Sequence, residues 1–194
     1  MMAQFQQDKG KLDLTPKRFN MWLFLFTSFM FFAALTSGFI VYIGGKGHGL
    51  NIKMPAAFMY STAIIMISSI TVFLASTAAK KSDVAKQRAF LWLTLLLGVG
   101  FFAMQIYAWY VLSFEMHAFL SNPNASISFV YVFSLMHLIH ILAGLVLLII
   151  SLVSTYRKTP QVLNLFRMEM SSIFWHFVDI IWIYLYVFLL LNQN

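Results

Sequence analysis

The 194-residue sequence contains no cysteine, and this absence excludes several kinds of redox and metal chemistry. Without a thiolate the chain has no disulfide, no cysteine-ligated iron–sulfur cluster, no c-type haem attachment and no cysteine-based copper centre. Any metal would need histidine, methionine or carboxylate ligands. Since the sequence has only 5 His and 6 Asp plus Glu, the candidate ligands are few.

Charged residues are also scarce. They make up 10% of the chain, and hydrophobic residues make up 61%, whereas soluble domains carry about 25% charged and about 45–50% apolar residues. The sequence therefore predicts an integral membrane protein. The net charge of +7 does not indicate a nucleic-acid partner, because Lys and Arg occur in short clusters between apolar runs rather than along one face with interleaved aromatic residues.

Five apolar runs dominate the chain, and none of them contains Lys or Arg. Each exceeds the roughly 18 residues that indicate a membrane-crossing helix. The predicted spans are residues 21–43, 54–79, 89–114, 126–156 and 170–191. Because the connections between them are short and rich in turn residues, the sequence predicts one all-α transmembrane domain, residues 1–194, built as a five-helix bundle.

Basic residues are distributed unequally between the two sides of this predicted domain. Only Lys46 and Lys53 fall on one side. The other side carries Lys9, Lys11, Lys17, Arg18, Lys80, Lys81, Lys86, Arg88, Arg157, Lys158 and Arg167. By the positive-inside rule, the N-terminus is predicted to be cytoplasmic and the C-terminus to face outside.

Polar residues within the predicted spans are candidate functional residues, because a bilayer makes them costly to bury. His137 and His140 lie in the fourth run, and His176 and Asp179 lie in the fifth. The three-residue spacing places each pair on one helical face, and the helical rise places both pairs near the middle of the membrane. We therefore expect the two pairs to approach one another across neighbouring helices.

Three interpretations of this cluster are open. The histidines could ligate haem or a redox metal, although His137 and His140 lie one turn apart on the same helix rather than facing each other across a pocket. The cluster could form a proton or substrate pathway of a small transporter, but there are no inverted pairs of broken helices. The interpretation we favour is an interhelical polar clamp, in which Asp179 accepts hydrogen bonds from His or Trp side chains.

Two further polar residues are expected to have local roles. Gln105, in the third run, is expected to form a hydrogen bond to a neighbouring helix. Glu169 precedes the fifth run, where a carboxylate would complement the dipole of a helix that begins there.

The stretch from Trp175 to Trp182, Trp-His-Phe-Val-Asp-Ile-Ile-Trp, resembles the last helix of subunit III of the haem–copper oxidases. That family closes on Trp-His-Phe-Val-Asp-x-x-Trp. The sequence His137-x-x-His140-x-x-x-Gly144 is similar to the family's preceding helix, and Glu169 falls on its acidic position. The five-helix length resembles the short bacterial form of this subunit.

The sequence departs from the family at two buried acids. Phe29 follows Thr27 and Ser28 where the family often has a carboxylate, and Ala108 stands where the family has the Glu of Gln-x-x-Glu after Gln105. The resemblance therefore implies a structural role for this chain rather than proton handling through those acids.

The resemblance implies a non-catalytic subunit of a proton-pumping terminal oxidase in the bacterial plasma membrane. Such a chain holds no haem or copper itself, packs against catalytic subunit I and other oxidase subunits, binds phospholipid between its helices and could join a respiratory supercomplex. The residues expected to form its structural polar clamp are His137, His140, His176, Asp179, Glu169, Trp175, Trp182 and Gln105.

Overall fold

The computed structural model describes residues 14–46, 55–115, 125–157 and 160–193, and these residues form five long helices. Each of the five is long and apolar enough to cross a membrane, which confirms the predicted all-α architecture. The helices are α2 (Thr15–Lys46), α3 (Ala56–Lys80), α4 (Val84–Tyr110), which continues into the short π-helix η1 (Val111–Glu115), α5 (Ala125–Tyr156) and α6 (Gln161–Leu191).

Local chemistry sets the starts of three helices. Pro55 and Pro160 immediately precede α3 and α6, where the missing N–H of proline costs no helical hydrogen bond. Asp83 caps α4, because its Oδ1 accepts the backbone N–H of Lys86 at 3.1 Å. The same hydrogen bond lowers the pKa of the Asp83 carboxyl group. Ser82 makes the preceding turn possible with a left-handed φ of 58°.

Several helices begin earlier than the apolar runs from which they were predicted. Helix α6 begins at Gln161 rather than Met170, and α4 begins at Val84 rather than Ala89. Apolar runs mark only the part of a helix that lies in hydrocarbon, and the 31 residues of α6 extend to about 46 Å, beyond a core about 30 Å thick. Basic residues that were expected in loops, such as Arg88 and Arg167, therefore lie on helices.

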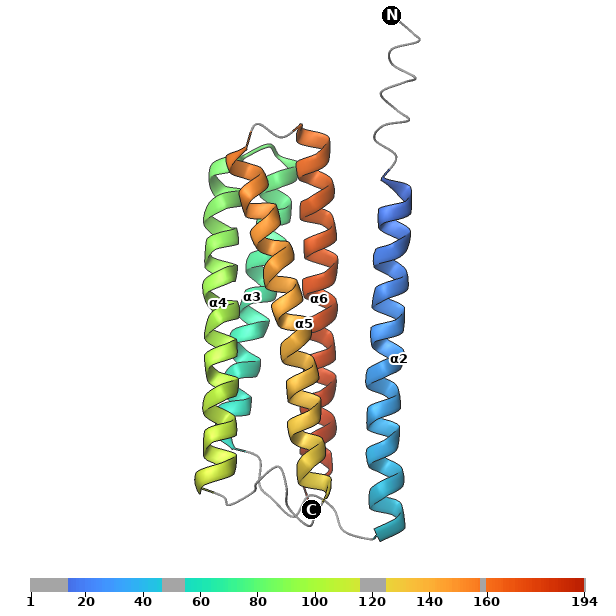
Figure 1. The fold of residues 1–194 in the computed structure, drawn as a ribbon. Coiled ribbons are helices and arrows are strands. Elements are labelled where there is room, and N and C mark those ends of the chain that lie inside the picture. The colour runs from blue at the N-terminus through green and yellow to red at the C-terminus, as the bar shows by residue number, and fades with distance from the viewer. Residues whose placement is uncertain (1–13, 47–54, 116–124, 158–159, 194) are drawn as a thin grey trace, which may run out of the picture.

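Helices α3, α4, α5 and α6 form a four-helix bundle, and α2 lies alongside it (Figure 1). Within the described residues α2 packs on α5 and α6, and its Cα atoms do not come within 8 Å of those of α3 or α4. Successive helices alternate in direction (Figure 1). Helices α2, α4 and α6 consequently begin at the same end of the molecule, which we call the basic end because it carries Arg18, Lys80 and Arg167.

Helix α2 packs against the bundle through a narrow apolar stripe. Leu25, Phe32 and Phe39 are buried at seven-residue intervals, the spacing that keeps side chains on one face of packed helices. The ring of Phe39 packs against Phe133 of α5 and Phe188 of α6, with ring centroids 5.9 and 5.4 Å apart. The other faces of α2 are largely exposed, so this helix has the least buried span of the five.

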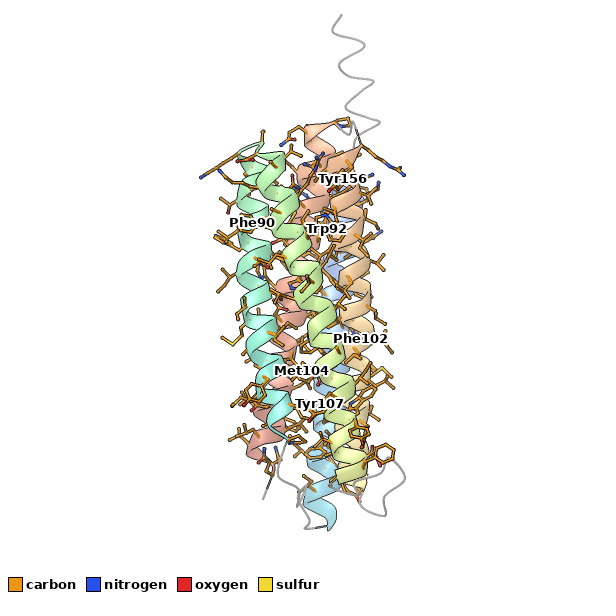
Figure 2. All side chains as sticks on the ribbon, turned by 90° about the vertical axis from the view of Figure 1, so that its left-hand side faces the viewer. Phe90, Trp92, Phe102, Met104, Tyr107 and Tyr156 are labelled. Atoms are coloured by element: carbon orange, nitrogen blue, oxygen red, sulfur yellow. The ribbon has the colours of Figure 1, made fainter. Side chains whose placement is uncertain are left out.

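The outer surface of the bundle is apolar and rich in aromatic side chains, as α4 illustrates (Figure 2). Trp92 and Tyr156 lie near the basic end and Tyr107 lies toward the opposite end of the same view (Figure 2). The guanidinium of Arg88 lies 4.2 Å from the centroid of the Tyr156 ring. Tyrosine and tryptophan near the ends of spanning helices are typical of the membrane interface.

Candidate functional site

Trp175 lies at the centre of the four-helix bundle and is fully buried. Its indole Nε1 donates a hydrogen bond to Ser68 Oγ of α3 at 3.0 Å. The ring lies against Gly98 of α4 and Gly144 of α5, where an added Cβ would come within 2.9 and 3.0 Å of ring carbons. A single side chain of α6 thus contacts all three other helices of the bundle, and the two glycines leave the space that it occupies.

Trp182, two turns further along α6, makes a similar set of contacts. Its Nε1 donates to Thr62 Oγ1 of α3 at 3.0 Å. The ring meets Phe101 of α4 edge-on at 5.1 Å between centroids and lies 4.8 Å from the ring of His137 of α5. Both tryptophans of the C-terminal motif therefore connect α6 to hydroxyl groups on α3 and to the interior faces of α4 and α5.

His176 and Asp179 lie on the α3 side of α6, but they do not form the expected clamp. His176 Nδ1 hydrogen-bonds to Ser69 Oγ at 2.6 Å. Asp179 is 3% exposed, and neither of its carboxylate oxygens has a hydrogen-bond partner among the described residues. Asp179 accepts no hydrogen bond from a His or Trp side chain of the described residues, contrary to the expectation. The nearest candidates, Trp175, His176 and Trp182, pair with hydroxyl groups of α3 instead.

The two histidines of α5 face different helices. His140 Nδ1 donates to the carbonyl of Met136 at 2.8 Å, so its Nε2 accepts from Ser28 of α2 at 3.3 Å. The His137 ring instead lies inside the bundle, between Phe101 and Trp182. The expected single cluster of two polar pairs is therefore not formed, because the two imidazoles, about 60° apart around α5, contact different neighbouring helices.

Gln105 and His137 are both fully buried, and neither side chain forms a hydrogen bond within the described part of the chain. Gln105 lies on α4 between Phe101, which contacts the His137 ring, and Trp109, whose Nε1 donates to Ser134 of α5 at 2.9 Å. The predicted hydrogen bond from Gln105 to a neighbouring helix is thus absent. Gln105 lies one helical turn from each of two aromatic residues that contact α5, Phe101 and Trp109.

Glu169 does not act on a helix dipole as expected. Helix α6 begins at Gln161, so Glu169 lies beyond the first turn, where the dipole effect has fallen off. Its Oε2 instead accepts a hydrogen bond from Arg18 Nη2 of α2 at 2.6 Å. Because the two side chains are 46% and 52% exposed, this ion pair contributes at most about 1 kcal/mol.

Polar contacts dock α2 onto the bundle at three depths. In order from the basic end to the opposite end, they are Arg18–Glu169 at 2.6 Å, Ser28–His140 at 3.3 Å and Thr36–Tyr184 at 2.9 Å. Together with the apolar stripe they set the position of α2 along and around its own axis.

The described residues contain no group of three or more His, Asp or Glu side chains that could hold a metal ion. Among the histidines of α5 and α6, His140 contacts Ser28 and His176 contacts Ser69. His137 contacts aromatic rings. The loops that contain His48 and His117 lie outside the described residues, and so does the side chain of Glu115.

Comparison with known proteins identifies the family. The family model described as cytochrome c oxidase subunit III matches residues 13–192. The chain belongs to the cytochrome c oxidase subunit III family. This confirms the resemblance seen in the C-terminal motif, and it identifies the chain as a multi-pass, non-catalytic subunit of a haem–copper terminal oxidase that partners with other oxidase subunits.

Curated relatives of two kinds are similar over most of their length. Subunit 3 of the cytochrome bo(3) ubiquinol oxidase of Pseudomonas aeruginosa is 32% identical over 168 residues, which cover 85% of this chain and 79% of that protein. Subunit 3 of the cytochrome c oxidase of Bacillus sp. strain PS3 is 27% identical over 179 residues, 90% of this chain and 85% of the relative. The bo(3) oxidase subunit 3 of Buchnera aphidicola from Acyrthosiphon pisum is 30% identical over 189 residues, 94% and 89% of the two chains.

Sequence reasoning missed a polar network at the basic end of this subunit III. Gln87 of α4 and Asn164 of α6 are buried and exchange two amide hydrogen bonds, at 3.4 and 3.1 Å. Arg88 donates through Nε to Thr155 Oγ1 of α5 at 3.2 Å and through Nη2 to the Thr155 carbonyl. Gln87, Arg88 and Asn164 fall outside the predicted spans, in segments where polar groups need no partner, and Thr155 lies at the end of the predicted fourth span. The helix-start residue Pro160 was the signal that could have placed Asn164 on a helix.

We predict that the Gln87–Asn164 amide pair stabilises the folded subunit because each side chain donates one hydrogen bond to the other and accepts one in return. Gln87→Leu should destabilise the subunit III by about 1–3 kcal/mol, because it leaves the Asn164 amide buried without its partner. The double variant Gln87→Leu/Asn164→Leu should recover part of this loss, since no amide is then left unpaired. Thermal unfolding of the purified subunit in detergent measures both. Additive losses in the double variant would contradict the prediction.

Proposed function

We propose that this chain stabilises catalytic subunit I of a proton-pumping bacterial oxidase and holds a phospholipid in a groove between α2, α3 and α6. The observation that carries the lipid proposal is a series of cavities along this groove, which change from charged to apolar away from the basic end. We call it the α2–α6 groove.

The first cavity of the α2–α6 groove has a volume of about 360 Å³ and lies at the basic end. Arg18, Lys80 and Glu169 contribute to its walls, one from each of the three helices. Two cations and one carboxylate suit a headgroup that carries both a phosphate and an ammonium group. Phe166 forms part of the apolar wall behind them.

Two further cavities continue the groove toward the middle of the membrane. One, of about 480 Å³, is lined by Trp22 and Ile173, each roughly one helical turn beyond Arg18 and Glu169. The other, of about 640 Å³, lies between α3 and α6. His176 lines both cavities. Ser69 and Asp179 also line the cavity between α3 and α6, and the remaining lining residues of both cavities are apolar. Their composition suits two acyl chains, one on each side of His176.

The orientation that we propose places the basic end in the cytoplasm. Lys and Arg near short loops set membrane orientation, and the described basic residues Lys17, Lys81, Arg88 and Arg157 all lie at this end. The bacterial sources of the relatives support a location in the plasma membrane.

We propose that cross-helix contacts keep the five helices in register for docking onto subunit I. Support comes from five of the eight residues singled out in the sequence, which have polar partners on other helices: Trp175, Trp182, His140, His176 and Glu169. His137 contributes ring contacts. Asp179 and Gln105 have no such partner within the described residues.

The test compares the purified oxidase with and without this subunit. We expect removal to leave the haem and copper content unchanged, to release bound phospholipid and to accelerate the loss of activity during turnover. Loss of haem in proportion to the subunit, or a Soret band in the isolated subunit that disappears in His137→Ala, would instead support the alternative of a redox protein. Mass spectrometry of the copurified chains also tests for supercomplex partners.

A further inference from the structure

Two polar side chains in the interior of the bundle, Gln105 of α4 and His137 of α5, have unused hydrogen-bonding capacity. Both are fully buried, and none of their polar side-chain atoms has a partner among the described residues. The amide of Gln105 offers donors and an acceptor, and a neutral imidazole offers one N–H donor and one nitrogen acceptor. Because buried polar groups are costly unless they are hydrogen-bonded, this interior needs a group that both donates and accepts.

The register of α4 and α5 brings these two side chains to the same level. Phe101 and Trp109 lie one turn on either side of Gln105, and both contact α5: the Phe101 ring lies 5.7 Å from the His137 ring, and Trp109 donates to Ser134 at 2.9 Å. The two helices run in opposite directions (Figure 1). Four residues from the Trp109–Ser134 contact, Gln105 is therefore level with the residue next to His137.

A third polar side chain reaches this level from α3. Thr71 and Thr94 join α3 to α4 by a hydrogen bond at 2.8 Å. Ten residues from this contact along the two antiparallel helices, Ser61 is level with the residue next to Gln105. Ser61 is fully buried, and its hydroxyl donates to the Phe58 carbonyl at 2.9 Å. The Ser61 oxygen thus retains capacity to accept a hydrogen bond.

The side chains at this level suit a small neutral ligand. Gln105 and Ser61 carry no charge, and the acid on the facing part of α6, Asp179, lines the cavity between α3 and α6 instead. A buried ion would therefore lack a counter-charge beside it. Water carries no charge, and a buried water typically makes about three hydrogen bonds to otherwise unsatisfied groups. Ser61 and Ala108, one turn beyond Gln105, are small, so bulky side chains do not compete for this space.

We propose that a water molecule is bound inside the bundle between Gln105, His137 and Ser61, and that it connects α4, α5 and α3. It donates to the Gln105 carbonyl oxygen and to an acceptor on His137 or Ser61, and it accepts from the Gln105 amide or the imidazole N–H. The level of Trp175 is closed by direct ring packing, whereas this level is closed by hydrogen bonds through water. The site is separate from the α2–α6 groove, so it does not depend on lipid binding.

The test is a cryo-electron microscopy map of the intact oxidase containing this subunit, at a resolution that shows ordered water elsewhere in the complex. We expect a separate density peak about 2.7–3.2 Å from polar atoms of both Gln105 and His137. A direct contact between the two side chains with no peak would overturn the proposal. A peak about 2.0–2.6 Å from its ligands would also overturn it, because such distances indicate a metal ion.

Substitutions then test which residues hold the water. We expect the peak to be lost in Gln105→Leu/His137→Phe, which removes the polar groups of α4 and α5. The matched control is His140→Phe, the same substitution one turn along α5, where the imidazole pairs with Ser28 and the Met136 carbonyl. The control should retain the peak. Retention of the peak in the double variant, or its loss in the control, would overturn the assignment, and the parent map decides the proposal if a variant does not assemble.

Discussion

Trp175→Ala is expected to destabilise the folded subunit by about 3–5 kcal/mol, the range for removing a buried tryptophan. The indole is fully buried at the centre of the four-helix bundle. Its removal leaves a cavity bordered by Gly98 and Gly144, neither of which has a side chain to fill it, and leaves Ser68 without its donor. Thermal unfolding of the purified subunit in detergent, and recovery of the assembled oxidase, measure the effect.

Trp92→Ala is the matched control, since it removes the same side chain from the membrane-facing surface of α4. Trp92 is 56% exposed, and its Nε1 makes only a 3.4 Å hydrogen bond to Tyr156. We expect this substitution to cost less than about 1 kcal/mol. If Trp92→Ala and Trp175→Ala lowered the free energy of unfolding by similar amounts, the buried position of Trp175 would not stabilise the subunit more than a surface position does.

Gly98→Ala is expected to destabilise the subunit by about 1–3 kcal/mol through overpacking. The new Cβ would lie 2.8 Å from Leu145 Cδ2 and 2.9 Å from Trp175 Cη2. The leucine methyl group can move, but the indole is held by its hydrogen bond to Ser68. The expected loss is notable because alanine is intrinsically the better helix former by about 1 kcal/mol. Thermal unfolding in detergent again provides the measurement.

Gly100→Ala tests this explanation two residues further along the same helix. A Cβ at Gly100 would have no atom within 4 Å, so the helix propensity of alanine should act alone and leave the subunit unchanged or more stable. If both alanine variants were stabilised, the Gly98–Trp175 contact would not limit packing. If both variants were destabilised equally, the close approach of Trp175 to Gly98 would not explain why α4 has glycine at these two positions.

The polar side chains of this subunit III satisfy one another mainly through hydroxyl groups. Ser28, Thr62, Ser68 and Ser69 accept from or pair with the imidazoles and indoles of α5 and α6. Small hydroxyl residues let membrane helices approach closely while supplying hydrogen-bond partners. The resulting contacts connect helices without placing several ionisable groups together, which suits a subunit that supports a catalytic partner.

The amino-acid sequence alone indicated several polar residues that contact other helices, but it did not predict their partners. The two tryptophans and the histidine of the C-terminal motif do contact other helices. However, spacing along one helix does not specify the rotation of the neighbouring helices. His137 and His140 share an approximate face, yet one is directed into the bundle and the other toward α2. Asp179 likewise lies beside its expected donors without binding them.

The number of spans and the family were determined by the sequence by itself, because apolar length and a contiguous motif are local properties that need no tertiary information. Only the tertiary structure decided the roles of Glu169, Gln87 and Trp175. An ion pair to α2, an amide pair across the basic end and an indole seated between two glycines all depend on side chains distant in sequence. Such partners are set by how helices pack and rotate against one another, which hydropathy does not encode.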